Sequence, residues 1–320
     1  MPRWLSRRVL ASASTLAFAV AGFCAVVVAG ATPAAAAESR QVVTAEIPRE
    51  EQAKVIVRLP VTRLTAGQPR FFYGRYAATS RYGLMMAAQL VCTVNGRGYT
   101  SVTSTMNHRG AELDPFARVI SVRWLFVPPV TGDYNCRLIG YAKTDDTEVP
   151  PDAKLVVVPG ANTLFGMHDD VKAGALEWRD PDSYLPPVEV ANPVAYVFDD
   201  STWTADPGAR RLDVRADVEV TAVSTGGDRP FAPLLTLTAQ QLGGDGCGTA
   251  TATVDPGEIV THHYKVQLTT RATISTATGC TRAFDVKVKV QYRPWPQPGH
   301  TRHGGRVEGG RYSNLILRNA

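Results

Sequence analysis

The sequence predicts an all-β protein made of two tandem antiparallel β-sandwich domains. Apolar and polar residues alternate along many short stretches, as in strands with one face in a core and one face in solvent. Turn-forming pairs such as Asn95-Gly96 and Pro150-Pro151 separate these stretches. A chain of 320 residues, 44% of them hydrophobic, is also long enough for about two such domains.

The first 37 residues have the three parts of a secretory signal peptide. Three arginines open the segment, an Ala- and Val-rich apolar run follows, and four alanines lead to a cleavage site after Ala37. We therefore expect residues 1–37 to be removed and the mature, secreted or cell-surface chain to begin at Glu38. The alternative is that the apolar run stays as a membrane anchor. No later run is long enough to span a membrane.

The charge of the mature chain is nearly balanced. Three of the 34 basic residues and none of the 29 acidic residues lie in the leader, so the mature chain has a net charge near +2. Such a small charge gives no electrostatic reason to expect a nucleic-acid partner. Only seven of the basic residues are lysines. This bias towards arginine favours a bacterial gene of high GC content.

Four cysteines remain in the mature chain, Cys92, Cys136, Cys247 and Cys280. Three pairings are possible, but the cysteines fall two by two into the two halves of the chain. An exported protein meets oxidising conditions, in which disulfides form. We therefore predict the disulfides Cys92–Cys136 and Cys247–Cys280, the first as a bridge between two sheets. A metal site or a reactive thiol is the alternative, but no C-x-x-C spacing supports it.

The first sandwich is predicted over residues 44–159. Its alternation is clearest over 118–127, where Trp124 shares a face with other apolar residues, and around Tyr134. We therefore expect Trp124 and Tyr134 to lie in the core and to have structural roles.

The segment Gly132-Asp133-Tyr134-Asn135-Cys136 resembles the G-x-Y-x-C end of an immunoglobulin-like domain, with Cys92 as the earlier disulfide cysteine. The resemblance covers roughly residues 85–142. It implies an immunoglobulin-like sandwich in which the tyrosine, two residues before the second cysteine, forms a tyrosine corner. No functional residue follows from it, because this fold hosts many functions.

The rest of the chain divides into three predicted parts. A linker is expected over 160–187, where apolar residues at helical spacing allow a short helix: Met167, Val171, Ala175 and Trp178. A second sandwich is expected over 188–293, with clean alternation in 212–222 and 284–292. Residues 294–320 form a Pro/Gly/Arg-rich tail, which we expect to be loosely held unless 314–317 adds a strand.

The sequence contains no G-x-S-x-G, H-E-x-x-H or phosphate-binding glycine motif. We therefore lean away from an enzyme, and we expect no metal site and no cofactor. The candidate ligand-contacting residues are Trp203 and Trp295, in predicted loops, and the neighbouring acids Asp199 and Asp200. Exposed aromatic rings can stack on sugars or anchor a protein contact.

Each candidate also has a purely structural interpretation. Asp199 and Asp200 are typical of a turn, and loop aromatics often cover a domain edge or the seam between domains. The same holds for the aromatic cluster at Phe71-Phe72-Tyr73. His168-Asp169-Asp170 has metal-ligating residue types, but it is also typical of the polar start of a helix.

Three functions remain open. The first hypothesis is a secreted, non-catalytic extracellular binding or adhesion protein, whose partner is an extracellular protein or a glycan. The second is a carbohydrate-binding or carbohydrate-processing protein that uses the loop aromatics and carboxylates. The third is a structural component of the cell envelope. Convergence of the loop acids and aromatics in one cleft would favour the second hypothesis.

Overall fold

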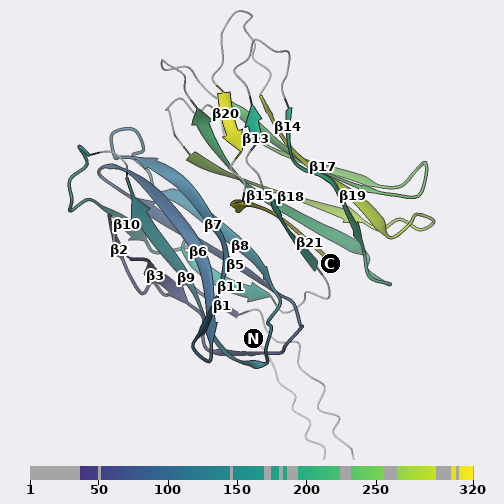
Figure 1. Cartoon of the computed structure of the whole chain (residues 1–320), viewed down its shortest axis with the longest axis horizontal. Helices are drawn as coiled ribbons and strands as arrows, with labels where there is room; N and C mark the ends of the chain where they lie inside the picture. The colour runs from purple at the N-terminus through teal and green to yellow at the C-terminus, as the bar shows by residue number, and fades with distance from the viewer. Residues whose placement is uncertain are drawn as a thin grey trace, which may run out of the picture. The chain divides into compact units, whose positions relative to one another are not determined.

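The computed structural model describes residues 37–49, 52–144, 147–168, 174–179, 183–185, 194–223, 232–255, 265–292, 304–307 and 310–319. Within these ranges the chain forms strands and turns, and no helix is present (Figure 1). The predicted all-β fold is therefore confirmed, and antiparallel sheets in a sandwich arrangement fit it. The predicted leader lies outside the described residues, except for Ala37.

Residues 37–168 supply two sheets. Sheet I has, in spatial order, β1 (Ala37–Ser39), β11 (Leu164–His168), β5 (Arg70–Thr79), β10 (Lys154–Val158) and β2 (Glu46–Pro48), with β8 (Arg118–Phe126) paired to β5. Sheet II has β3 (Lys54–Arg58), β9 (Gly132–Lys143), β6 (Gly83–Val94) and β7 (Arg97–Arg109), with β4 (Thr62–Leu64) paired to β9.

Residues 174–319 supply two further sheets. Sheet III has β12 (Gly174–Arg179), β21 (Gly310–Asn319), β15 (Arg211–Val223), β20 (Gly304–Val307) and β13 (Ser183–Leu185), with β18 (Lys265–Ser275) paired to β15. Sheet IV has β14 (Val194–Thr204), β19 (Ala283–Tyr292), β16 (Pro233–Gln241) and β17 (Thr249–Val254). No strand is shared between the two pairs of sheets.

The core of the first half follows the predicted alternation. Trp124 and Tyr134 are 5% and 0% exposed, and both pack around the ring of Phe126. The Tyr134 hydroxyl donates a hydrogen bond to the carbonyl oxygen of Val130, four residues upstream, at 2.8 Å. This is the bond that a tyrosine corner makes. The inward placement of both residues is therefore confirmed.

Both predicted disulfides are present, and one of them lies differently from the expectation. Cys247 is bonded to Cys280 and Cys92 to Cys136. Cys92 and Cys136 are direct register partners on β6 and β9, with their Cα atoms 4.0 Å apart. The first disulfide therefore cross-links two neighbouring strands of sheet II and does not bridge two sheets. The prediction of a bridge between sheets is wrong. It was based on which face of its strand each cysteine occupies, and this does not say which strand lies opposite.

The described residues of 160–187 form strands and turns and not the short helix that the spacing allowed, and Val171 lies outside the described residues. Met167 lies in β11, which pairs with β5, and residues 174–179 form β12, which pairs with β21. Glycine is costly within a helix, and Gly174 falls inside the apolar pattern. Neighbouring strands satisfy the backbone groups that a helix would have paired internally.

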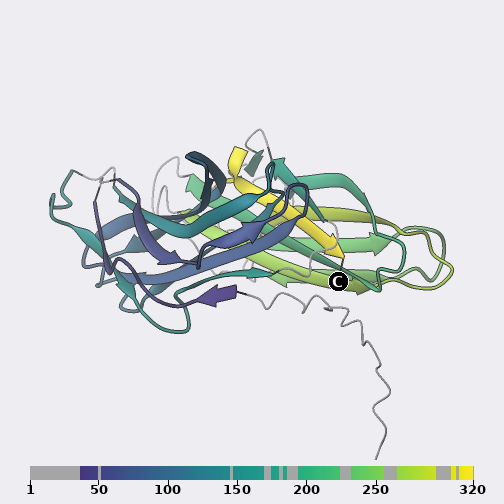
Figure 2. The ribbon, with the colours of Figure 1, turned by 90° about the horizontal axis from the view of Figure 1, so that it is seen from below.

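The region 294–320 is not a loosely held tail in the part that the structure describes. Strand β21 pairs with β12 on one side and with β15 on the other. Its side chains from 313 to 319 are buried. Figure 2 shows this strand, in yellow, running alongside the green strands of its half of the chain. The alternative that 314–317 adds a strand is therefore confirmed, and the strand is longer than expected and lies inside a sheet.

Candidate functional site

The outward face of sheet I carries an unusual set of side chains. Along β5, even-numbered residues such as Phe72 and Tyr76 enter the core, whereas Tyr73 and Arg75 point to the other side. Register places Arg123 of β8 opposite Tyr73 on one side and Gly166 of β11 on the other. Neighbouring strands thus present cationic and aromatic side chains on one surface.

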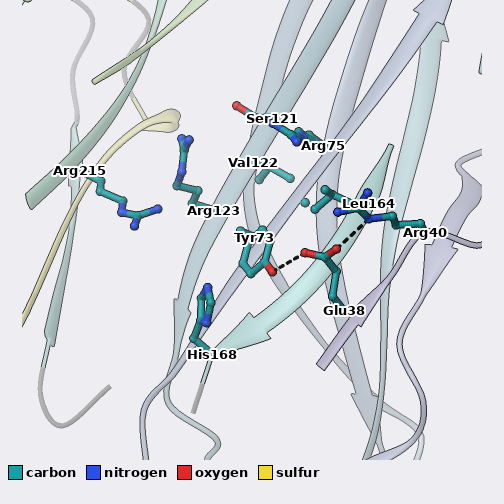
Figure 3. A pocket seen from close by; sticks show the side chains of 11 residues that line it. Glu38, Arg40, Tyr73, Arg75, Ser121, Val122, Arg123, Leu164, His168 and Arg215 are labelled. Carbon is teal, nitrogen blue, oxygen red and sulfur yellow. Dashed lines mark hydrogen bonds and ion pairs between the residues drawn. The ribbon is translucent and has the colours of Figure 1, made fainter. Parts of the chain in front are cut away.

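These side chains line a cavity of about 330 Å³, which we call the arginine pocket. Its lining side chains come from β1, β5, β8 and β11 of the first half and from β15 of the second half (Figure 3). The polar and aromatic members are Glu38, Arg40, Tyr73, Arg75, Ser121, Arg123, His168 and Arg215. Glu38 is the one acidic residue in this lining.

A hydrogen bond across three strands closes one side of the pocket. Tyr73 reaches over Gly166, and its hydroxyl donates to Glu38 Oε2 at 2.9 Å. Only glycine leaves room for this ring, because a Cβ at 166 would lie 2.3 Å from Tyr73 Cζ. Arg40 Nε donates to the second carboxylate oxygen of Glu38 at 2.8 Å. The ring of His168 lies 5.0 Å from the Tyr73 ring, nearly parallel to it.

These contacts fix the protonation states of Glu38 and Tyr73 at neutral pH. The hydrogen bonds from Arg40 and Tyr73 hold the pKa of Glu38 below its usual value, so it is an ionised acceptor. Burial and the bond to Glu38 raise the pKa of Tyr73 to about 12, so its hydroxyl is a donor. Neither group has a pKa near 7, where general acid–base catalysis is most effective. The pair is therefore suited to binding.

Arg75 lines the pocket and has no carboxylate bonded to it among the described residues. Its Nη2 donates to the carbonyl oxygen of Ala161 at 2.8 Å. Its Nε is buried and has no hydrogen-bond partner in the described part of the chain. A buried donor without a partner is costly. The Arg75 side chain is half-buried and lines the cavity, so an anion there could bind its guanidinium group without displacing a carboxylate.

The remaining arginines are held by buried acids on β15. Arg123 forms a short ion pair with Asp217, and Arg215 pairs with Asp213 at 3.2 Å. Asp213 also accepts from Arg271 at 2.6 Å and from Arg318 at 2.8 Å.

Burial opposes ionisation of Asp213. The guanidinium groups nevertheless hold the pKa of this carboxyl below its usual value. Among the described residues, guanidinium groups at and behind the pocket therefore outnumber carboxylates by six to three. The carboxylates are Glu38, Asp213 and Asp217, and the guanidinium groups are those of Arg40, Arg75, Arg123, Arg215, Arg271 and Arg318.

The polar face of β15 forms a seam with the first half of the chain. Asp213, Asp217 and Glu219 are at most 1% exposed. Glu219 Oε2 accepts from the backbone N–H of Thr105 at 2.9 Å. The two halves are packed together closely enough that residues 34–320 form one compact unit. The division into two domains with a linker at 160–187 therefore stays a prediction.

The predicted aromatic cluster belongs to this seam. The guanidinium carbons of Arg215 and Arg318 each lie 4.9 Å from the centre of the Phe71 ring. Phe71 also packs with Leu125 and Ile316 in a small apolar cluster. The expectation that these aromatics could cover a seam holds for Phe71, whereas Phe72 lies in the core and Tyr73 lines the pocket.

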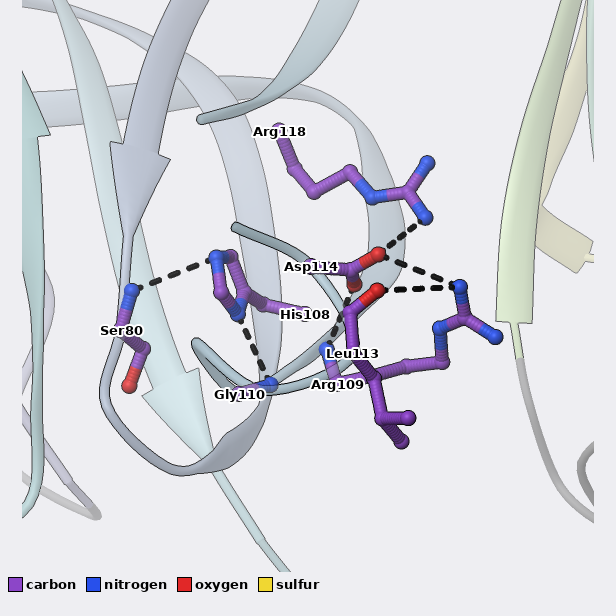
Figure 4. A network of polar contacts seen from close by, with 7 residues as sticks. All are labelled: Ser80, His108, Arg109, Gly110, Leu113, Asp114 and Arg118. Carbon is purple, nitrogen blue, oxygen red and sulfur yellow. Dashed lines mark hydrogen bonds and ion pairs between the residues drawn. The ribbon is translucent and has the colours of Figure 1, made fainter. Parts of the chain in front are cut away.

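A second polar network joins the end of β7 to the start of β8 (Figure 4). Asp114 accepts from the backbone N–H of Arg109 at 2.8 Å and from Arg118 Nη2 at 2.5 Å. Burial opposes its ionisation, but these bonds lower the pKa of Asp114 to about 2. The buried ring of His108 accepts from the Gly110 N–H at Nδ1, at 3.0 Å. Its Nε2 faces a second backbone N–H, that of Ser80, at 3.3 Å.

The predicted ligand-contacting residues lie elsewhere. Asp199, Asp200 and Trp203 are within β14, not in a turn or loop, and the pairing with β19 shifts register around Asp199. Asp199 is exposed and lies 3.6 Å from Lys287 Nζ. Trp203 is half-buried and packs against the core. None of the three lines the arginine pocket, and Trp295 lies outside the described residues.

The residue types at Asp199 and Asp200 predicted a turn. They lie instead in β14, an edge strand, where turn-type residues are tolerated at bulges. The pocket residues were missed as a site. His168 was noted as a possible metal ligand, but Asp169 and Asp170 lie outside the described residues. Among the residues that the structure describes, no three His, Cys, Asp or Glu side chains are grouped as metal ligands. The described chain also contains no helix that is long and apolar enough to cross a membrane.

Comparisons with known proteins give only a weak likeness of fold. No family model matches the chain, and no curated protein matches it significantly. A solved structure of the infectious bursal disease virus Gt strain is similar at a TM-score of 0.31 and 10% identity, over 85% of this chain and 75% of the viral chain. A tandem CBM22 domain pair from Paenibacillus barcinonensis gives a TM-score of 0.23 and 10% identity, over 87% and 94%. The case for a function therefore depends on the pocket.

Proposed function

We propose that the protein is an exported, non-catalytic binding protein whose arginine pocket holds an anionic ligand. One observation carries this proposal: the excess of guanidinium groups over carboxylates at the pocket, in a mature chain of nearly balanced charge. Such a local excess raises the concentration of anions near the surface. Guanidinium groups also match the geometry of carboxylate, sulfate and phosphate oxygens.

Binding is favoured over catalysis by the chemistry of the lining. Its ionised Glu38 and protonated Tyr73 are already hydrogen-bonded to each other, and neither titrates near neutral pH. Ser121 is the one serine or threonine in the lining and so the one candidate hydroxyl nucleophile there. No hydrogen bond from it to a base is present among the described residues. A nucleophile needs such a base.

Export is supported by the predicted leader and by the two disulfides. The Tyr134 bond to Val130 fits the tyrosine corner that the resemblance implied, whereas the Cys92–Cys136 bond within one sheet departs from the inter-sheet bridge of immunoglobulin domains. N-terminal sequencing of secreted protein tests the export step, and we expect the chain to begin at Glu38. Protein retained in the membrane fraction with the leader intact would contradict export.

Calorimetric titration with simple anions and anionic polymers tests the binding step. We expect binding that weakens as salt rises, because charge attraction is screened. Arg75→Gln should weaken it by about tenfold or more, since a charged hydrogen bond is lost. Arg58→Gln is the matched control and should have no effect, because the Arg58 side chain is exposed on β3 of sheet II. Equal anion affinity of the wild-type protein, Arg75→Gln and Arg58→Gln would contradict a site at the arginine pocket.

A further inference from the structure

The position of Glu38 restricts which anion the arginine pocket accepts. Its carboxylate is about one-third exposed and lines the same cavity as the guanidinium groups. A bare sulfate or phosphate that filled this cavity would place its negative charge near Glu38, and like charges repel. A ligand that fits must therefore be negative at one end and offer hydrogen-bond donors at the other.

Hydroxyl groups are the donors that suit this carboxylate. An ionised carboxylate only accepts hydrogen bonds and has about four lone-pair positions. Two of those positions on Glu38 are filled, by Tyr73 and by Arg40. The other positions can accept from ligand hydroxyls. An ammonium donor suits the site less well, because the positive charges of Arg40 and Arg75, which already act on Glu38, would repel it.

An aromatic surface lies between the two ends. The rings of Tyr73 and His168 are inclined by 21° with their centres 5.0 Å apart. Figure 3 shows Tyr73 between Glu38 and His168, with Arg123 and Arg215 on the other side of its ring. Flat aromatic rings with a polar edge pack against ligands that are partly apolar and partly hydroxylated. The ring of a sugar is such a ligand.

We infer that the arginine pocket takes an acidic sugar, a hexuronate unit of a glycan, with its carboxylate on Arg75 and its hydroxyls on Glu38. This inference rests on the proposed function and names the ligand class of the same site. The cavity of about 330 Å³ is large enough for a small ligand. The half-buried Arg75 lines this cavity and has no carboxylate partner among the described residues, so its guanidinium group is the one that would take the sugar carboxylate.

Titration calorimetry with three probes tests the inference on the secreted chain. Trigalacturonate carries carboxylates and hydroxyls, its methyl ester keeps the hydroxyls without the charge, and sodium sulfate has the charge alone. We expect trigalacturonate to bind best and the ester to bind about tenfold more weakly or worse. Arg75→Gln should weaken trigalacturonate binding to the level of the ester, and Arg75→Lys should have an intermediate effect, because lysine keeps charge without the guanidinium fork.

Glu38→Ala gives the sharpest outcome because two probes should respond in opposite directions. Binding of trigalacturonate should weaken as the hydroxyl acceptor is removed, whereas binding of sulfate should strengthen as the repulsion from the carboxylate disappears. Thermal melts verify that each variant is folded, and Arg58→Gln is again the control.

Some outcomes would separate the inference from the proposed function. Sulfate, or a peptide of aspartates, binding more tightly than trigalacturonate in an Arg75-dependent manner would overturn the acidic sugar and leave an anion site. Trigalacturonate binding that Glu38→Ala does not weaken would also overturn it. Failure of every anion to bind would overturn the proposed function itself.

Discussion

Replacement of Gly166 by alanine should release the Tyr73 ring from the wall of the arginine pocket. The added Cβ would lie 2.3 Å from both Cζ and Oη of Tyr73, so the ring must move. It then loses its 2.9 Å hydrogen bond to Glu38 and its packing on His168. Each of these contributes about 0.5–1.5 kcal/mol, and partial exposure of Glu38 favours the lower end. We expect Gly166→Ala to lower the free energy of unfolding by about 1–3 kcal/mol.

A double-mutant cycle measured by urea unfolding isolates this clash. In a Tyr73→Ala background the same Gly166→Ala change should cost less than about 0.5 kcal/mol, because the ring that it displaces is absent. Gly98→Ala is the control, since a Cβ at that strand position would meet nothing closer than 3.9 Å. Additive costs of the Gly166 and Tyr73 changes would refute the close approach described for this ring.

Three other changes probe the core, the buried charges and the response to pH. Tyr134→Phe removes the hydroxyl bonded to Val130 and should cost about 1–3 kcal/mol in urea melts; an unchanged midpoint would contradict it. Asp213→Ala leaves three guanidinium groups without their carboxylate and should cost about 3–5 kcal/mol, against less than about 0.5 kcal/mol for exposed Asp245→Ala. Burial holds the pKa of His108 below its usual value, so the unfolded chain binds a proton first and stability should fall as pH drops below about 6.5. His108→Gln should flatten that fall, and a wild-type profile that is level from pH 7 to pH 5 would contradict it.

Strands could be predicted from the sequence because they follow from the local alternation of apolar and polar residues. Disulfides could be predicted because an exported chain with paired cysteines meets oxidising conditions. The alternation around Trp124 and Tyr134 indicated which face is buried, and the structure places both in the core. The distribution of cysteines between the halves indicated the pairing. Register could not be predicted, because the alternation that assigns Cys92 to a face does not say which residue lies opposite. The same-sheet position of the Cys92–Cys136 bond was therefore missed.

The arginine pocket was missed because its residues resemble the solvent face of ordinary strands. Asp213, Arg215 and Asp217 alternate with apolar residues, which is the pattern of a strand with one side exposed to solvent. That side instead packs on the first half of the chain, through contacts between residues far apart in the sequence. One signal was present: Phe71 and Tyr73 make the outward face of their strand aromatic, which is typical of a strand covered on both sides.

The position of β21 has a consequence for the order in which the protein can fold. Residues 310–319 fill the place between β12 and β15, and Arg318 on this strand binds Asp213. During synthesis the ribosome releases this strand after β12 and β15, so sheet III has a missing inner strand until late in translation. A chain with that gap exposes strand edges and leaves Asp213 without one of its three arginine partners.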